Sequence, residues 1–355
     1  MQQTIRAKLA MIFSPSMGRM RAYWLLVLLL LAPAPAFGAA APVRLKIGTA
    51  SITASTLSLW IAQEQGIFSR HGIEAQTILI RGGPTLFASL VSGDTPLVFT
   101  TGAPFLGAAA QGVDVKMLTS ISDRVSWKLM AAPKIKTAQD LHGKKIGVQS
   151  IVGATWMNSM LALEQLGLEP KRDNIAFLPT GDPITMAQAL EAGRIDAAVL
   201  DPVLSRGLSG KGFTLLVDLL KAHVFFPGLG LGVTRSYLDQ HAPTVENVVT
   251  PLTESLVFIL TPANKPVVLK SMMKHLRTAD QAAVEDGYQD QLLTLNRKPY
   301  PSLEGLRNAQ RLMALQNPKI GALKIEDLVD SRFVRKLDES GFIDRLYGAP
   351  QPPRR

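Results

Sequence analysis

The sequence contains no cysteine in its 355 residues. This absence excludes disulfide frameworks, thiolate zinc sites, cysteine nucleophiles and acylation of an N-terminal cysteine. Charged residues are also scarce, at 19%, whereas hydrophobic residues make up 47%, so the composition is that of a packed globular chain rather than a disordered one. The length is enough for two ordinary domains.

Motifs for catalysis, metals and cofactors are missing as well. The five histidines are scattered, with no HExxH, and the sequence has no Walker A lysine loop and no GxSxG elbow. Gly228, Gly230 and Gly232 form a GxGxG in a strand-like segment, which indicates close backbone packing rather than a dinucleotide site. Ser271 to Lys274 matches SxxK without its companion motifs. We therefore predict no catalytic residue, no metal ligand, no cofactor and no enzymatic activity.

The N-terminal segment differs from the rest. Residues 1–41 carry four basic residues and no acidic one, then an apolar run of 13 residues and a small-residue stretch, which is typical of a secretory signal peptide. The run is too short for a spanning helix. Removing this segment lowers the formal charge from +10 (38 − 28) to about +6 (34 − 28). No basic run with interleaved aromatics remains, so we predict no nucleic-acid partner.

The remaining chain alternates short apolar strands with amphipathic helices, and this order repeats. The expected strands and helices of the first set are 43–50, 57–65, 73–80, 85–91, 97–100, 104–111 and 115–121. Those of the second set are 134–141, 145–149, 154–166, 174–178, 183–192, 195–200, 213–216 and 229–233. Helices are then expected at 244–260, 266–285, 302–316 and 331–340. The pattern predicts two doubly wound α/β lobes, each with a parallel sheet, and a helical C-terminal tail.

Hydroxyl groups and glycines gather where predicted strands pass into helices. The four clusters are Thr49 with Ser51, Thr53, Ser55 and Thr56; Gly82 with Gly83; Thr100 to Ala103; and Ser150 to Thr155. Such turns present unpaired backbone N–H groups at a positive helix end, which can hold an anionic or strongly polar ligand. Capping of the helices by Ser and Thr is the structural alternative.

Five motifs, in their order along the chain, resemble one family. They are Leu57 to Phe68, His71 to Glu74, Leu90 to Asp94, Asp140 to Val148 and Glu191 to Ala198. The first two look like the "A-x-E-x-G-hydrophobic-F … G-hydrophobic-E" signature of periplasmic solute-binding proteins of nitrate, sulfonate and taurine ABC transporters. That family shares its fold with thiamine-pyrimidine-precursor-binding proteins. The sequence departs from the family pattern at Pro96, which predicts that the strand there begins at Leu97.

The resemblance implies a type II periplasmic binding protein with a ligand cleft between two lobes. The implied division is 43–131 with 229–348 for lobe 1 and 132–228 for lobe 2, with crossing segments near Ala131 and at 221–228. The ligand would be a small sulfonate-, taurine- or nitrate-like anion, or a related nitrogen or sulfur compound. The partner would be an ABC permease in the inner membrane, and the protein would be a periplasmic monomer.

The resemblance also implies the ligand contacts, which fall on the strand-to-helix turns. These residues are Ser51, Ser55, Thr56, Gly83, Thr101, Gly102, Gly153, Ala154 and Thr155, with Asp182 and Asp201 as polar contacts of the second lobe. Trp127 is a candidate for stacking on the ligand or for core packing. Arg81 or Arg124 is a candidate for neutralising a sulfonate. An Asp201 that faced the cleft would favour an amine-bearing ligand.

Two alternative functions remain open from the sequence. The first is a thiamine-pyrimidine-precursor-binding or synthase-like protein, which is similar in fold. The synthases carry an essential cysteine-rich motif and act in the cytosol, so the absence of cysteine and the signal peptide both count against a synthase. The extracytoplasmic ligand sensor of a signalling system would use the same two lobes. Loss of ligand uptake after gene removal would favour the importer over the sensor.

Overall fold

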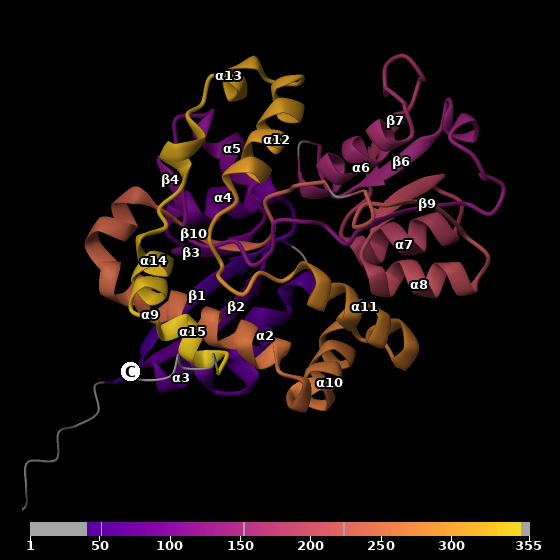
Figure 1. Cartoon of the computed structure of the whole chain (residues 1–355). Coiled ribbons are helices and arrows are strands. Elements are labelled where there is room, and N and C mark those ends of the chain that lie inside the picture. The colour runs from indigo at the N-terminus through magenta and orange to yellow at the C-terminus, as the bar shows by residue number, and fades with distance from the viewer. Residues whose placement is uncertain (1–40, 51, 152, 223, 349–355) are drawn as a thin grey trace, which may run out of the picture. The chain divides into compact units, whose positions relative to one another are not determined.

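The computed structural model of the chain describes residues 41–348 except residues 51, 152 and 223 (Figure 1). The predicted signal peptide therefore lies outside the described residues, apart from its last residue. Within the described ranges, no helix combines the length and the apolar content that crossing a membrane requires.

Two five-stranded sheets form the framework. The first has the order β2-β1-β3-β10-β4 and the second the order β7-β6-β8-β5-β9. The strands of the first are β1 Val43–Thr49, β2 Ile73–Leu79, β3 Leu97–Thr100, β4 Val115–Met117 and β10 Gly230–Thr234. Those of the second are β5 Lys128–Ala131, β6 Lys145–Val148, β7 Ala176–Pro179, β8 Ala197–Leu200 and β9 Thr214–Asp218. The prediction that the strand after Pro96 begins at Leu97 is confirmed.

Helices follow most of these strands. Those of the first set are α2 Leu57–Glu64, α3 Ile67–Arg70, α4 Gly83–Ser92 and α5 Ala103–Ala109, with the short 3₁₀ helix η1 Ala54–Thr56. Those of the second set are α6 Ala154–Gln165, α7 Pro183–Glu191 and α8 Pro202–Gly210, with η2 Gln139–Leu141. The α/β fold class with repeated strand-helix units is confirmed.

The expectation of purely parallel sheets is wrong in one respect. β10 runs antiparallel to β3 and β4, and β5 runs antiparallel to β8 and β9. β5 is the first strand after the chain passes from the first sheet to the second, and β10 is the first strand after the chain returns to the first sheet. Each of them therefore enters its sheet from the side opposite to the other strands and runs in the opposite direction. β5 was not predicted from the sequence: it has only four residues and follows the long connection 118–127.

The C-terminal helices pack on both sets of elements. They are α9 Arg235–Leu260, α10 Lys265–Leu276, α11 Gln281–Thr294, α12 Leu303–Ala314, α13 Pro318–Gly321, α14 Arg332–Glu339 and α15 Phe342–Leu346, with η3 Pro262–Asn264 and η4 Ile325–Leu328. α9 packs on α2, whereas α11 lies against α8 and α12 contacts α5 and α6 (Figure 1). The helical tail predicted from the sequence therefore also ties the two sheets together.

Two predicted helices differ from the observed ones for local reasons. The single helix expected over 266–285 is broken, because Arg277 adopts a left-handed conformation and Asp280 accepts a hydrogen bond from the Ala283 N–H to start α11. The helix expected over 134–141 is reduced to η2. There the Asp140 carboxylate accepts hydrogen bonds from the N–H groups of Lys136 and Thr137, and this turn competes with helix formation.

Candidate functional site

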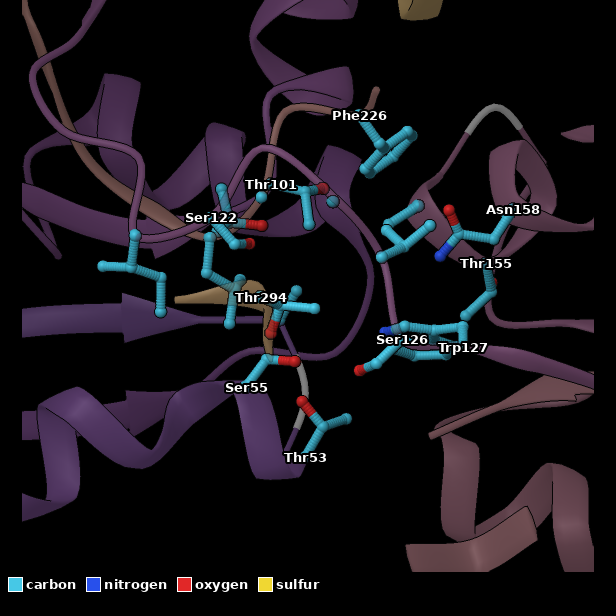
Figure 2. A pocket seen from close by; sticks show the side chains of 18 of the residues that line it. Thr53, Ser55, Thr101, Ser122, Ser126, Trp127, Thr155, Asn158, Phe226 and Thr294 are labelled. Carbon is cyan, nitrogen blue, oxygen red and sulfur yellow. The ribbon is translucent and has the colours of Figure 1, made fainter. Parts of the chain in front are cut away.

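A pocket lies where strands of both sheets end and the following helices begin (Figure 2). Its volume is about 50 Å³, which is room for roughly four water-sized groups. The lining residues are Thr49, Ala50, Thr53, Ser55, Gly83, Thr100, Thr101, Pro104, Ile121, Ser122, Arg124, Val125, Ser126, Trp127, Gln149, Ser150, Ala154, Thr155, Asn158, Phe226, Gly228, Leu229, Gln291 and Thr294. The site thus combines the turns after β1, β3 and β6 with the segments that connect the sheets and with the last turn of α11.

Polar but uncharged groups dominate this lining. Among its described residues there is no aspartate or glutamate, and Arg124 is the single cation. Three of the lining residues have a buried side-chain atom with no hydrogen-bond partner in the described structure: Thr101 Oγ1, Ser150 Oγ and Asn158 Oδ1. A buried polar group left unpaired costs about 1–3 kcal/mol, so these three groups are available for hydrogen bonds to a ligand.

The two halves of the pocket face each other. Figure 2 shows Thr101, Ser122, Thr294 and Ser55 on one side and Trp127, Thr155 and Asn158 on the other. One direct contact joins the halves, because the Gln149 side chain donates to the Ala50 carbonyl oxygen over 2.7 Å. The pocket is therefore closed from two sides by groups from both sheets.

The helices that start at the pocket begin differently from those that start elsewhere. Gly82, Gly102 and Gly153 are the N-cap residues of α4, α5 and α6, so no side chain caps these helix ends. In contrast, Asp182 caps α7 and Asp201 caps α8 through their carboxylates. Pro84 and Pro104 leave the second position of α4 and α5 without an N–H group, and the Phe105 N–H donates to the Gly102 carbonyl oxygen. α6 has no such proline, so its first turn keeps N–H groups for other acceptors. Because glycine has no capping side chain, the structural alternative of side-chain capping does not apply to these three helix ends.

Six of the predicted contact residues line the pocket. They are Ser55, Gly83, Thr101, Trp127, Ala154 and Thr155. Thr155 also accepts a hydrogen bond of 2.7 Å from the Gln149 N–H, which fixes the turn after β6. Gly83 allows α4 to begin close to α5, because a Cβ atom there would lie 2.8 Å from Pro104 Cγ. Ser51 lies outside the described residues.

The structure places five predicted residues outside this lining. They are Thr56, Gly102, Gly153, Asp182 and Asp201. Gly102 serves packing, because a Cβ atom there would lie 2.7 Å from Leu306 Cδ2 and collide with Pro227. Gly153 lets the turn after β6 fold back on Ser150. Thr56 is buried at the start of α2.

Asp201 is buried beneath the first turn of α8 and does not face the pocket. Its Oδ1 atom accepts hydrogen bonds from the N–H groups of Val203 and Leu204 at 2.9 and 3.1 Å. Burial raises the pKa of this carboxyl to about 6, although the two N–H groups and the Lys128 charge act in the opposite direction. An amine-bearing ligand was expected only if Asp201 faced the cleft, and Asp201 does not line the pocket.

The two candidate arginines have different positions. Arg124 lines the pocket and lies 3.8 Å from the Asp123 carboxylate. Arg81, between β2 and α4, instead pairs at 2.8 Å with Asp182 at the start of α7. Arg81 therefore joins elements that belong to the two different sheets, whereas Arg124 lies at the pocket.

Several lining residues were missed by the sequence analysis. Asn158 lies four residues after Ala154 on α6, so helical spacing from a predicted contact was a usable signal. Gln291 and Thr294 lie on α11, and no local pattern connects them to turns more than 130 residues earlier in the chain. In the described part of the chain, no three His, Asp or Glu side chains gather to hold a metal ion.

The protein has the fold of the periplasmic solute-binding proteins. This fold is defined here by two mixed sheets, the segments that connect them and the pocket at the strand ends. Residues 54–264, more than half of the chain, match the NMT1/THI5-like family model, and the chain belongs to that family.

Known proteins are similar to this chain over different lengths. A candidate binding protein of Brucella abortus is 31% identical over 170 residues, which is 47% of this chain and 50% of that protein. The chain thus spans about half the length of the curated relatives it matches.

Solved structures resemble the chain over most of its length. The alkanesulfonate-binding protein of Xanthomonas axonopodis pv. citri, bound to MOPS, has a TM-score of 0.67 and 22% identity, covering 82% of this chain and 100% of that one. The periplasmic nitrate-binding protein of Synechocystis PCC 6803 has a TM-score of 0.64 and 11% identity, covering 88% and 92%. At these identities the likeness establishes the fold.

Proposed function

We propose that this protein is the extracytoplasmic solute-binding component of an ABC importer, and that the pocket holds a compact anionic or strongly polar group such as a sulfonate. The observation that carries the proposal is the set of buried, unpaired polar groups at glycine-capped helix ends, in a lining without carboxylates. Oriented N–H groups, hydroxyls and one arginine stabilise an anion, whereas a cation would meet no counter-charge.

The size of the pocket supports a head group of few atoms. A sulfonate or nitrate has four non-hydrogen atoms, and a cavity of about 50 Å³ matches a group of that size. The lobes would close over the ligand and the closed form would dock on a membrane permease in the inner membrane. The synthase alternative requires cysteines that this sequence does not contain. The sensor alternative shares the site and is separated by an uptake assay after gene removal.

Thr101→Val tests whether the unpaired hydroxyl is kept for a ligand. The substitution replaces a hydroxyl by a methyl group of similar size, so we expect affinity for methanesulfonate, nitrate or taurine to fall about tenfold, measured by calorimetric titration. Because the hydroxyl has no partner in the described structure, the unliganded protein should keep its melting temperature or gain slightly.

Thr77→Val is the matched control. The Thr77 hydroxyl on β2 is also buried and without a hydrogen-bond partner among the described residues, but it does not line the pocket. This variant should bind as the wild type does. If none of the three anions binds the wild type, or if both variants lose affinity equally, the assignment of the pocket is wrong.

The Arg81–Asp182 pair is expected to favour the closed form. Arg81 is 63% exposed and Asp182 14% exposed, so the pair is worth about 1 kcal/mol or less. Arg81→Gln should therefore weaken methanesulfonate binding at most about fivefold, because it destabilises the closed form without touching the pocket. A double-mutant cycle with Asp182→Ala measures the coupling. Additive effects of the two substitutions on affinity would show that the pair does not contribute to closure.

A further inference from the structure

The segment 121–127 carries the chain from the first sheet to the second and supplies six of the residues that line the pocket. Figure 2 shows Ser122 on one side of the pocket and Trp127 on the other, so the segment passes along the pocket from side to side. It lies between β4 and β5 and belongs to neither strand. Its conformation therefore depends on what holds it in place from outside.

The helix α11 holds this segment at both ends. At one end, the N–H of Asn296, just beyond α11, donates to the Ile121 carbonyl oxygen over 2.8 Å. At the other end, the Lys128 ammonium group donates to the Asp290 carboxylate of α11 over 3.0 Å. The first contact is made by the backbone alone. The second depends on two side chains, so the sequence can change it.

The Lys128–Asp290 pair is partly buried and lies among other carboxylates. Its side chains are 19% and 17% exposed. Burial raises the pKa of Asp290, the hydrogen bond from Lys128 opposes this effect, and the nearby Asp218 and Asp286 carboxylates add to it. The Lys128 charge also acts on the buried Asp201 carboxyl. Asp290 thus depends on Lys128 to stay ionised, and a partly buried pair is screened less than a surface pair.

Each member of the pair adjoins a residue of the pocket, although neither member lines the pocket itself. Lys128 follows Trp127, and Asp290 precedes Gln291. The Asp290 carbonyl oxygen also accepts a hydrogen bond of 3.0 Å from the hydroxyl group of Thr294, a third lining residue. The pair therefore connects parts of the lining that are far apart in the chain.

We propose that Lys128 and Asp290 are positioning residues for ligand binding: their ion pair fixes the spacing between Trp127 and Gln291 without touching the ligand. This inference rests on the proposed function and deepens it. A site binds tightly only if its contact groups are held in the productive geometry by neighbours that are themselves fixed. Here the neighbours are the two charged side chains directly behind the lining.

A double variant, Lys128→Met with Asp290→Leu, separates positioning from stability. It removes the ion pair and leaves no unpaired charge. Replacement of a buried ion pair by apolar side chains is often neutral or stabilising, so the melting temperature should stay within about 4 °C of the wild type or rise. The affinity for methanesulfonate, measured by calorimetric titration, should nevertheless fall about tenfold, as it does when outer partners of other binding sites are removed.

Single variants test the same point from the other side. Lys128→Met alone leaves Asp290 without its cation, beside Asp218 and Asp286, so it should lower both the melting temperature and the affinity. Lys128→Arg keeps the charge and the hydrogen-bond donor, so it should bind methanesulfonate within about threefold of the wild type. We expect the affinity to follow the presence of the pair and not the melting temperature.

A spectroscopic signal reports the position of Trp127 directly. In protein labelled with 5-fluorotryptophan, the Trp127 resonance is assigned by its loss in Trp127→Phe. This resonance should shift or broaden in the double variant without any ligand. The resonances of Trp60 on α2 and Trp156 on α6, which are 3% and 1% exposed, should stay in place. A change confined to Trp127 is expected from a positioning role and not from a general loss of structure.

The Arg206–Asp286 pair is the matched control. It joins α8 to α11, but its side chains are 53% and 46% exposed and neither residue adjoins a lining residue. Arg206→Met with Asp286→Leu should keep the wild-type affinity and the Trp127 resonance. Wild-type affinity in the Lys128/Asp290 double variant, or an equal loss in the control, would overturn the proposal. Failure of the wild type to bind methanesulfonate, nitrate and taurine would instead refute the proposed function.

Discussion

Gly230→Ala is expected to lower the free energy of unfolding by about 3 kcal/mol or more. Gly230 lies on β10, the strand between β3 and β4, and a Cβ atom there would collide with the carbonyl oxygen of Thr119 and lie 2.9 Å from Met117 Cε. The close approach is held by two hydrogen bonds: the Leu231 N–H donates to Thr119 Oγ1, and the Leu118 N–H donates to the Leu231 carbonyl oxygen. The backbone cannot move away without breaking the sheet, so overpacking is not relieved.

Urea unfolding of Gly230→Ala and Gly207→Ala measures this effect. Gly207 lies on α8, and a Cβ atom there meets no described atom within 4 Å. The same substitution should therefore be neutral or stabilise by up to about 1 kcal/mol, because alanine is the better helix former. A loss below 1 kcal/mol for Gly230→Ala would mean that the two segments separate easily. The other two glycines of the GxGxG pattern are equally crowded, because a Cβ atom would collide with Ser122 at Gly228 and with the Phe105 ring at Gly232. A large loss for Gly230→Ala would therefore explain the whole pattern by close packing.

The difference in stability between the wild type and Asp201→Asn should change by about 3 kcal/mol between acidic and alkaline pH. Burial raises the folded-state pKa of Asp201 to about 6 from an ordinary value of 3.8. The folded state then holds a proton that the unfolded state has lost, so this group's contribution to stability falls as the pH rises from about 4 to 6. Asparagine keeps an oxygen for the Val203 and Leu204 N–H groups without a charge, so the variant should be the more stable protein above about pH 7.

Asp182→Asn is the matched control, with the opposite sign expected. Asp182 caps α7 as Asp201 caps α8, but its pKa is lowered: the Arg81 and Thr185 hydrogen bonds outweigh the effect of its burial. Its contribution is present at neutral pH and is lost as the pH falls below its ordinary value of 3.8. The variant should thus be less stable than the wild type at neutral pH and converge with it in acid. Parallel pH profiles for both variants would contradict the assignment.

Local patterns in the sequence were sufficient for part of the site. The glycine and hydroxyl turns after β1, β3 and β6 are short-range features, and Ser55, Thr101 and Thr155 line the pocket as those turns predict. The same patterns did not separate a helix-capping aspartate from a ligand contact, because Asp182 and Asp201 also follow strands. The Asp182 and Asp201 carboxylates accept hydrogen bonds from the first turns of α7 and α8, and these bonds turn them away from the pocket.

The sequence alone determined the α/β class, the repeated strand-helix units, the family resemblance and the absence of cysteine chemistry, because periodicity, turn residues and composition are local properties. Only the tertiary structure decided the direction of β5 and β10, the role of Arg81 and the arrival of Gln291 and Thr294 at the pocket. These features depend on contacts between residues far apart in the chain, and the chain must close around both sheets before such residues meet. The lack of cysteine has the same consequence throughout: packing and hydrogen bonding between distant segments, rather than disulfides, hold the site together.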